Sequence, residues 1–254
     1  MSAATGAIWS EEAGPDDGPV IAVIHGSMDR SAGLLKLSRR LDDEHRVVRY
    51  DRRGYGRSTP HDGPFGMDGQ VTDLVTVLRG RPAVLFGHSY GGNVALATAE
   101  RHPELVRAVG VYESPLSWLD WWPATTAGGD ALSTEDDPAS AAERFMRRLI
   151  GDDRWERLPP STRVARRAEG QAMIGELTDL RERAPWHPVG IQVPSMALRG
   201  SDGADHHRLS TEHIGAEVPG CEIIVIDGAR HFGPNTHPDQ VAAAISGLAA
   251  RASP

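Results

Sequence analysis

The sequence predicts an α/β fold in which a mostly parallel, twisted sheet is flanked by helices and carries a helical insertion. Short apolar runs rich in β-branched residues alternate with amphipathic stretches along most of the chain, a pattern typical of parallel strands joined by helices. Residues 115–189 break this alternation. The chain has 254 residues, which is long enough to bury a sizeable core by itself.

The apolar runs are the expected strands of the sheet: residues 20–24, 47–50, 83–86, 108–112, 195–198 and 223–226. The amphipathic stretches between them are the expected helices: residues 31–44, 67–79, 91–101 and 238–250. In sheets of this kind, active sites lie at the carboxyl ends of the strands. Functional side chains are therefore expected directly after the apolar runs.

Residues 115–189 are rich in tryptophan, arginine, proline and acidic residues. Helices are expected near residues 138–150 and 160–183, because Pro159 and Pro160 forbid one continuous helix across this segment. The segment is therefore predicted to be a helical insertion. The core domain is predicted to comprise residues 1–114 and 190–254.

The composition indicates which binding partners and which compartment to expect. The net charge of -8 disfavours a nucleic-acid-binding surface. The single cysteine, Cys221, excludes an internal disulfide and fits a reducing compartment. Residues 1–6 lack the basic and apolar regions of a signal peptide, and no segment has the roughly 18 apolar residues of a membrane span. We therefore expect a soluble, cytoplasmic monomer or homodimer that acts on a small molecule, without nucleic-acid or membrane partners.

The most informative segment is Gly-His-Ser-Tyr-Gly at residues 87–91, which places Ser89 between two glycines. It follows an expected strand and precedes an expected helix. A turn this tight needs flanking residues without side chains, and it holds the serine in a strained conformation that lifts the hydroxyl off the sheet. The Gly-x-Ser-x-Gly pattern in this context predicts that Ser89 is a catalytic nucleophile.

The first apolar run ends in a sharp turn at residues 24–27, whose backbone N–H groups can face the serine. The N–H groups of Ser27 and Tyr90 are predicted to form an oxyanion hole, with Met28 as the alternative to Ser27. A simple turn that ends a strand is the competing interpretation. His25 is expected to stabilise this turn rather than to act as a base.

A base is best sought after the last strand, where a loop bracketed by glycines contains His231. Its imidazole can reach the serine proton there. His88 is expected to point away from the nucleophile. The scattered histidines lack the spacing of a metal site, so no metal is predicted. Four histidines in helical contexts are expected on the surface: His206, His207, His213 and His237.

Four motifs together resemble the α/β-hydrolase superfamily. They are His25-Gly26 after the first parallel strand, Asp-Arg-Arg-Gly-Tyr-Gly-Arg-Ser at residues 51–58, the Gly-x-Ser-x-Gly turn and the Gly-x-x-His-Phe loop at His231. The resemblance covers residues 7–114 and 190–254 and implies an α/β-hydrolase fold. It also implies that the helical insertion is a cap over the active site. The segment that begins at Asp51, with Arg52 and Arg53, is a structural loop in that family.

The acid that orients the histidine departs from the family's common pattern. In the family, the usual acid follows the strand before the histidine strand, but Gly203 stands at that place here. Asp202 lies one residue early and Asp205 two residues late. Some family members, including one group of haloalkane dehalogenases, take the acid from the strand end that corresponds to Glu113. Glu113 is favoured and Asp202 is the alternative, because a buried carboxylate needs a partner such as the imidazole N–H.

The sequence therefore predicts a cofactor-free serine hydrolase with Ser89, His231 and Glu113 as its catalytic triad. Esters are the expected substrates, followed by thioesters, lactones and amides. A cofactor-independent lyase or isomerase and a non-catalytic binding protein on the same fold are the alternatives. Tryptophans close to the Glu113 strand end, Trp118 and Trp122 with Trp121 between them, are expected in the substrate pocket, because such pockets are mostly apolar. Their alternative role is to attach the cap to the core.

Overall fold

The computed structural model describes residues 6–133 and 137–252. Within them, one seven-stranded sheet has the order β1-β3-β2-β4-β5-β6-β7. All neighbouring strands pair in parallel except β1, which is antiparallel to β3. The mostly parallel sheet is confirmed, and β1 is an unexpected seventh strand because its polar sequence gives no apolar run. The strands are β1 (Ser10–Ala13), β2 (Val20–Ile24), β3 (Arg46–Tyr50), β4 (Ala83–His88), β5 (Val106–Tyr112), β6 (Ser195–Gly200) and β7 (Glu222–Ile226).

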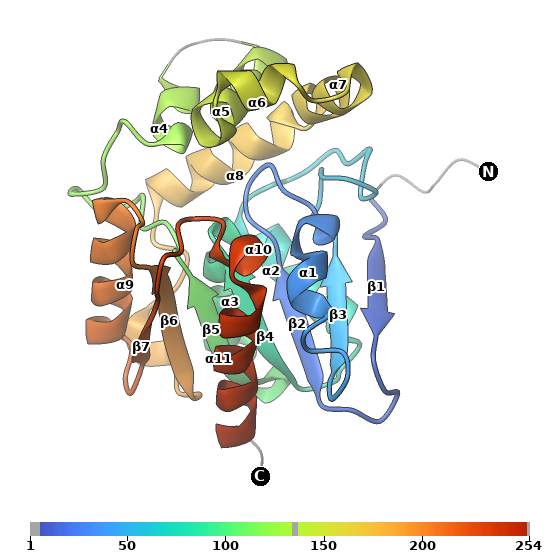
Figure 1. Cartoon of the computed structure of the whole chain (residues 1–254), viewed down its shortest axis with the longest axis vertical. Coiled ribbons are helices and arrows are strands. Elements are labelled where there is room, and N and C mark those ends of the chain that lie inside the picture. The colour runs from blue at the N-terminus through green and yellow to red at the C-terminus, as the bar shows by residue number, and fades with distance from the viewer. Residues whose placement is uncertain (1–5, 134–136, 253–254) are drawn as a thin grey trace.

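Helices cover both faces of the sheet (Figure 1). Helices α2 (Met67–Leu78), α3 (Tyr90–Arg101) and α9 (Asp205–Glu217) pack on one face, and α1 (Leu35–Ser38) and α11 (Pro238–Arg251) pack on the other. Short helical turns complete the core: η1 (Ser31–Leu34), η2 (Pro103–Leu105), η3 (Pro188–Gly190) and α10 (Gly233–Thr236). No helix in the described part of the chain is long and apolar enough to cross a membrane.

The helix expected over residues 31–44 is shorter and less regular than predicted. Only η1 and α1 are helices, and turns with hydrogen bonds between residues three or four apart continue the segment. Leu34, Leu37 and Leu41 are nevertheless all buried against the sheet. The apolar periodicity therefore predicted the buried face of this segment correctly, but not the length and type of its helices.

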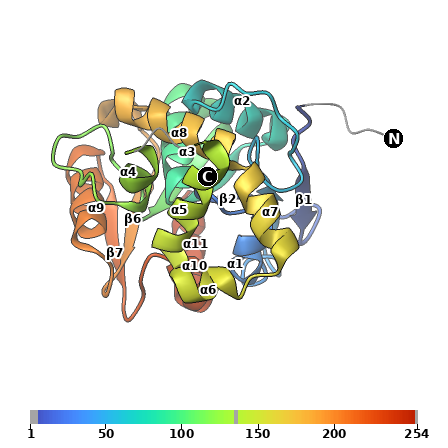
Figure 2. The same ribbon diagram turned by 90° about the horizontal axis from the view of Figure 1, so that it is seen from above.

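A layer of helices, which we call the cap, connects β5 to β6. It comprises α4 (Ala127–Leu132), α5 (Pro138–Ile150), α6 (Asp152–Glu156), α7 (Pro160–Ala168) and α8 (Gly170–Glu182). Figure 1 shows the cap above one end of the sheet, and Figure 2 looks down onto it. The predicted helical insertion is thus present. Its limits at residues 115 and 189 stay a prediction.

The helix expected over residues 160–183 is divided into α7 and α8 at Glu169. The buried Glu169 carboxylate accepts hydrogen bonds from Arg30 and from the Gly56 N–H. At the first residue of α8, a side chain on Gly170 would come within 1.9 Å of the Pro138 carbonyl oxygen. The division is therefore set by contacts with the core and with α5, which the periodicity of the segment does not reveal.

Arg52 joins the strand ends of the core. Its fully buried side chain donates hydrogen bonds to the His25 and Gly26 carbonyl oxygens, at 2.9 and 3.0 Å. The guanidinium carbon lies 5.0 Å from the ring centre of Tyr55 and 4.7 Å from that of Tyr90, within the range of a cation–π interaction. Arg52 therefore holds together the end of β2 and the start of α3.

The same side chain joins the core to the cap. Arg52 donates to the Glu176 carboxylate of α8 at 2.6 Å, and the Tyr55 hydroxyl donates to that carboxylate at 2.7 Å. Both members of the ion pair are fully buried. The Glu176 charge raises the pKa of Arg52 despite its burial, so the guanidinium stays charged. A buried pair of this kind is costly to break from one side, because the remaining charge has no partner.

We expect Glu176→Gln to lower the free energy of unfolding by about 3 kcal/mol, because it leaves the Arg52 charge buried without a counter-ion. Urea unfolding followed by circular dichroism measures this loss. The matched control is Glu182→Gln at the exposed last residue of the same helix, which should change stability by less than about 0.5 kcal/mol. Equal effects of the two substitutions would show that the buried pair does not attach the cap.

Candidate active site

Ser89 lies at the sharp turn between β4 and α3. Its backbone has φ 54° and ψ -126°, in the positive-φ region that residues with a side chain rarely adopt. A side chain on Gly87 would come within 2.2 Å of the Gly91 carbonyl oxygen, and one on Gly91 within 2.4 Å of the Ile24 carbonyl oxygen. Both glycines are therefore required by close backbone contacts. The strained turn expected from the sequence is present.

The turn after β2 lies directly beside Ser89. Strands β2 and β4 are paired with Ile24 opposite Gly87, so the residues that follow them are neighbours. A side chain on Gly26 would come within 2.9 Å of Ser89 Cβ. The backbone N–H groups of Ser27 and Tyr90 donate no hydrogen bond to any described residue. Both donors expected for the oxyanion hole are thus available to a ligand, and Ser27 lines the same cavity as Ser89.

His25 is part of the scaffold of this turn. The fully buried ring contacts the Gly26 carbonyl oxygen through Nδ1 at 2.8 Å and accepts the Arg52 N–H at Nε2, at 2.9 Å. Burial lowers the pKa of His25 well below its usual value, with the Arg52 charge adding to the effect. Because both ring nitrogens are occupied, His25 has no free lone pair with which to accept a serine proton.

Glu113 and His231 form a hydrogen bond with each other. Glu113 directly follows β5 with φ 47° and is almost completely buried. One carboxylate oxygen accepts the His231 Nδ1–H at 2.8 Å, and the other accepts the Gly200 N–H at 3.0 Å. Since a carboxylate only accepts, this contact places the imidazole proton on Nδ1 and leaves the Nε2 lone pair free. The Ser89 hydroxyl makes no hydrogen bond to His231 in the described structure, although both side chains line the same cavities.

The competing acid, Asp202, has no contact with His231. It is exposed, and its carboxylate accepts a hydrogen bond from the Ser201 hydroxyl at 2.9 Å. The glycine at position 203, where the family pattern places the acid, explains why Glu113 contacts His231 instead. A side chain on Gly203 would come within 2.8 Å of the Glu113 carboxylate. The space that an acid at position 203 would fill is thus occupied by Glu113.

The His231 loop is held by the ends of β4 and β5. His88 donates from Nε2 to the His231 carbonyl oxygen at 2.7 Å, and the Tyr112 hydroxyl donates to the Arg230 carbonyl oxygen at 2.8 Å. His88 itself lines one of the two cavities that Ser89 and His231 share. His88 is therefore a support for the histidine loop, a role that the strand alternation did not predict.

Two histidines of α9, His206 and His207, were expected on the surface but line the cavity beside Ser89. The His207 ring stacks on that of His231, with centres 4.5 Å apart and an angle of 11° between the planes. Its Nε2 lies 3.7 Å from the Glu113 carboxylate, which is too long for a hydrogen bond. Burial lowers the pKa of both histidines. Their position after the β6 strand end was the available signal, because active sites collect at such ends.

A metal-binding arrangement was not predicted, but three described side chains have potential ligand atoms within 4.8 Å of one another. They are Glu113, His207 and His231. Glu113 and His231 are already hydrogen-bonded to each other through His231 Nδ1. A metal ion that bound His231 at Nδ1 would have to displace the proton that Nδ1 donates to Glu113, because a metal-bound imidazole nitrogen is deprotonated.

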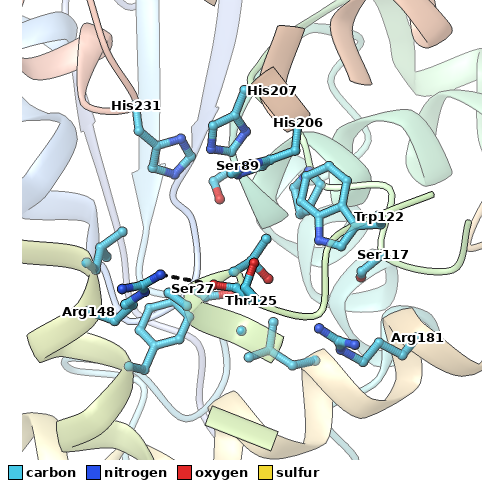
Figure 3. A pocket seen from close by; sticks show the side chains of 17 residues that line it. Ser27, Ser89, Ser117, Trp122, Thr125, Arg148, Arg181, His206, His207 and His231 are labelled. Carbon is cyan, nitrogen blue, oxygen red and sulfur yellow. Dashed lines mark hydrogen bonds between the residues drawn. The ribbon is translucent and has the colours of Figure 1, made fainter. Parts of the chain in front are cut away.

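Ser89 and His231 lie between two cavities. One has a volume of about 270 Å³ and extends under the cap (Figure 3), and the other has a volume of about 540 Å³ and extends toward η1 and α10. Trp122 lines the smaller cavity, and its contact with a substrate stays a prediction. Trp118 does not line either cavity in the described structure. Its ring packs edge-on against Trp186, 5.6 Å between centres, and joins the apolar core instead.

The fold and the arrangement of Ser89, His231 and Glu113 agree with a comparison to known protein families. The family model described as the alpha/beta hydrolase family matches residues 21–244, and the chain belongs to that family. The expected α/β-hydrolase fold, with its helical cap, is therefore confirmed.

Individual relatives are distant. A 2-(acetamidomethylene)succinate hydrolase of Mesorhizobium japonicum is 24% identical over 248 residues, which cover 90% of this chain and 87% of that protein. A proline iminopeptidase of Arabidopsis thaliana is 25% identical over 166 residues, which cover 58% of this chain and 43% of the relative. Among solved structures, a thermophilic esterase of Thermogutta terrifontis has a TM-score of 0.75 at 22% identity, covering 96% of this chain and 93% of that one. This last similarity shows the shared fold.

We expect Glu113→Gln to lower kcat/KM for a short ester by about 10³-fold to 10⁴-fold, because the amide cannot hold His231 in the required tautomer. Steady-state kinetics on a chromogenic ester measures the effect. Asp202→Asn is the matched control and should change the rate little, since Asp202 is exposed and does not contact His231. The reverse order of effects would move the acid to the end of β6.

We also expect His88 to make stability depend on pH. Burial, together with the charge of the neighbouring His231, lowers the pKa of His88 to about 3, whereas the unfolded chain titrates near pH 6.5. Between these values the unfolded state binds a proton that the folded state does not, so stability is lost as the pH falls below about 6.5.

The measurement is urea unfolding at three pH values between 6.5 and 4.5. The quantity to compare is the slope of the free energy of unfolding against pH. His88→Gln keeps a donor for the His231 carbonyl and should lower this slope by about 1 kcal/mol per pH unit. His187→Gln, whose side chain is 78% exposed in the wild-type protein, should leave the slope unchanged. An unchanged slope in His88→Gln would show that His88 does not resist protonation in the folded protein.

Proposed function

We propose that this protein is a serine hydrolase that cleaves a small-molecule ester through an acyl-enzyme intermediate. The observation that carries the proposal is the 2.8 Å contact between Glu113 and His231 at the cavity that also contains Ser89. This contact gives the imidazole a free Nε2, which is the atom that a serine nucleophile needs as its base. No cofactor is required by this chemistry.

The reaction follows from the arrangement of these groups. Ser89 Oγ attacks the carbonyl carbon, and its proton passes to His231 Nε2. The N–H groups of Ser27 and Tyr90 stabilise the oxyanion that forms. As the intermediate collapses, the bond to the alcohol oxygen breaks, and His231 returns the proton to that oxygen. Water then attacks the acyl group by the same route, which releases the acid and restores Ser89.

Membership in the family and the names of similar proteins support hydrolysis of an acyl bond. One relative is called an esterase, one a hydrolase of an acetamidomethylene compound and one an iminopeptidase. Esters are the class that we propose first, because the two cavities beside Ser89 leave room for both halves of an ester. Thioesters, lactones and amides would use the same residues.

We expect Ser89→Ala to lose ester hydrolysis by about 10⁵-fold without unfolding, because it removes the nucleophile and little else. A short-chain chromogenic ester panel measures turnover, and mass spectrometry after treatment with a fluorophosphonate locates the adduct. Wild-type protein should carry the adduct on Ser89. Ser117→Ala is the matched control, since Ser117 lines the same cavity, and should still be labelled at Ser89.

An adduct on Ser27 or Ser117, or full activity of Ser89→Ala, would contradict the assignment of the nucleophile. A protein that shows neither turnover nor label would be a binding protein rather than a hydrolase. A protein that is labelled at Ser89 but hydrolyses no ester would favour a lyase or isomerase that uses the same residues for proton transfer.

A further inference from the structure

The smaller cavity beside Ser89 is positively charged, although the chain as a whole is acidic. Two arginines of the cap line it, Arg148 of α5 and Arg181 of α8. No aspartate or glutamate is among the described residues that line it, whereas the chain has 35 acidic residues against 27 basic ones. Figure 3 shows both guanidinium groups reaching into the cavity from the side opposite Ser89 and His231.

These two arginines differ from their neighbours in the cap, which are paired with acids. Arg147 contacts the Glu143 and Glu156 carboxylates, and Arg183 contacts Asp179. Arg181 has no ion pair or hydrogen bond with any described residue. Arg148 donates one hydrogen bond, to the Thr125 carbonyl oxygen at 3.3 Å. Arg148 and Arg181 therefore bring two positive charges to this cavity, and no described carboxylate pairs with either of them.

Arg181 is also partly buried. Burial lowers its pKa, and arginine nevertheless stays protonated in proteins. The guanidinium lies against Gly129, where a side chain would come within 2.9 Å of Arg181 Nη2. A charge withdrawn from water without a partner costs free energy, which a bound anion would recover. An arginine fork matches the two oxygens of a carboxylate.

The cavity wall also has apolar side chains, beside its hydroxyl groups and histidines. Trp122, Phe145 and Leu177 contribute to it. The volume of about 270 Å³ fits a short chain rather than a long lipid. Resting on the proposed hydrolase function, we propose that the substrate is a short ester that carries a carboxylate, which Arg181 binds with the help of Arg148 while an apolar spacer reaches Ser89.

Kinetics on matched esters tests this proposal. The anionic esters are the monomethyl esters of succinate, glutarate and adipate, and their neutral controls are methyl butyrate, valerate and hexanoate. The acetate ester of 4-hydroxybutyrate, with butyl acetate as its control, places the carboxylate on the alcohol side. We expect at least one anionic ester to exceed its control in kcat/KM by about tenfold or more, the value of a charge-assisted hydrogen bond.

Arg181→Gln should reduce that preference by about tenfold to a hundredfold. Arg181→Lys should have an intermediate effect, because it keeps the charge but loses the fork. Arg183→Gln, two residues further along and 60% exposed in its side chain, is the matched control and should leave the preference unchanged. Circular dichroism and thermal unfolding of each variant show whether it is folded.

A second measurement does not depend on turnover. Isothermal titration calorimetry with monomethyl glutarate, on Ser89→Ala, should show binding that weakens by a similar factor when Arg181→Gln is added. If the wild-type protein hydrolyses neutral esters without preferring any anionic one, or if Arg181→Gln keeps the preference, the substrate class is wrong and the hydrolase proposal stands. If no ester is hydrolysed, the hydrolase proposal fails, and calorimetric binding that is absent or independent of Arg181 overturns the carboxylate site as well.

Discussion

The buried side chain of Arg52 is the contact on which the geometry of the molecule depends most. It donates to the carbonyl oxygens at the end of β2, lies against the ring of Tyr90 at the start of α3 and pairs with Glu176 of α8. These three partners belong to the turn after β2, the Ser89 turn and the cap. One fully buried charge therefore fixes the relative positions of all three. A neutral side chain could not replace it, because the buried Glu176 carboxylate would then have no counter-ion.

The position of Glu113 is the second constraint, and it follows from the pairing of β5 with β6. Tyr112 is opposite Leu198, so the residue after β5 lies beside the end of β6. There the Gly200 N–H and the His231 ring satisfy both carboxylate oxygens. The absence of a side chain at Gly203 and the positive φ of Glu113 are both required for this contact. The chain thus supplies from the end of β5 the carboxylate that the resemblance to the family would place at the end of β6.

Much of the fold and part of the candidate site could be predicted from the sequence, for physical reasons that differ between residues. The six apolar strands and the Ser89 turn were predictable because burial on both faces and tight backbone contacts leave strong local patterns. The strand β1 was not, since an edge strand need not be apolar. His206 and His207 face the cavity because α9 begins at a strand end, and a helical pattern alone does not show which side meets a site. Trp118 packs on Trp186, a partner far away in the sequence. The break at Glu169 depends on Arg30 and Gly56, which are also far away in the sequence.

The contacts that hold Glu113 and His231 all come from the core. Gly200, His88 and Tyr112 provide them, and none of these residues belongs to the cap. The wall of the smaller cavity, by contrast, is built largely from the cap and from the segment that leads from β5 into it. Substitutions in the cap can therefore remodel the cavity while the hydrogen bonds of Glu113 and His231 remain unchanged. The architecture thus separates a core that holds Glu113 and His231 from a cap whose cavity lining can be replaced, provided that a new cap still meets the core at the contacts that Glu169 and Glu176 now make.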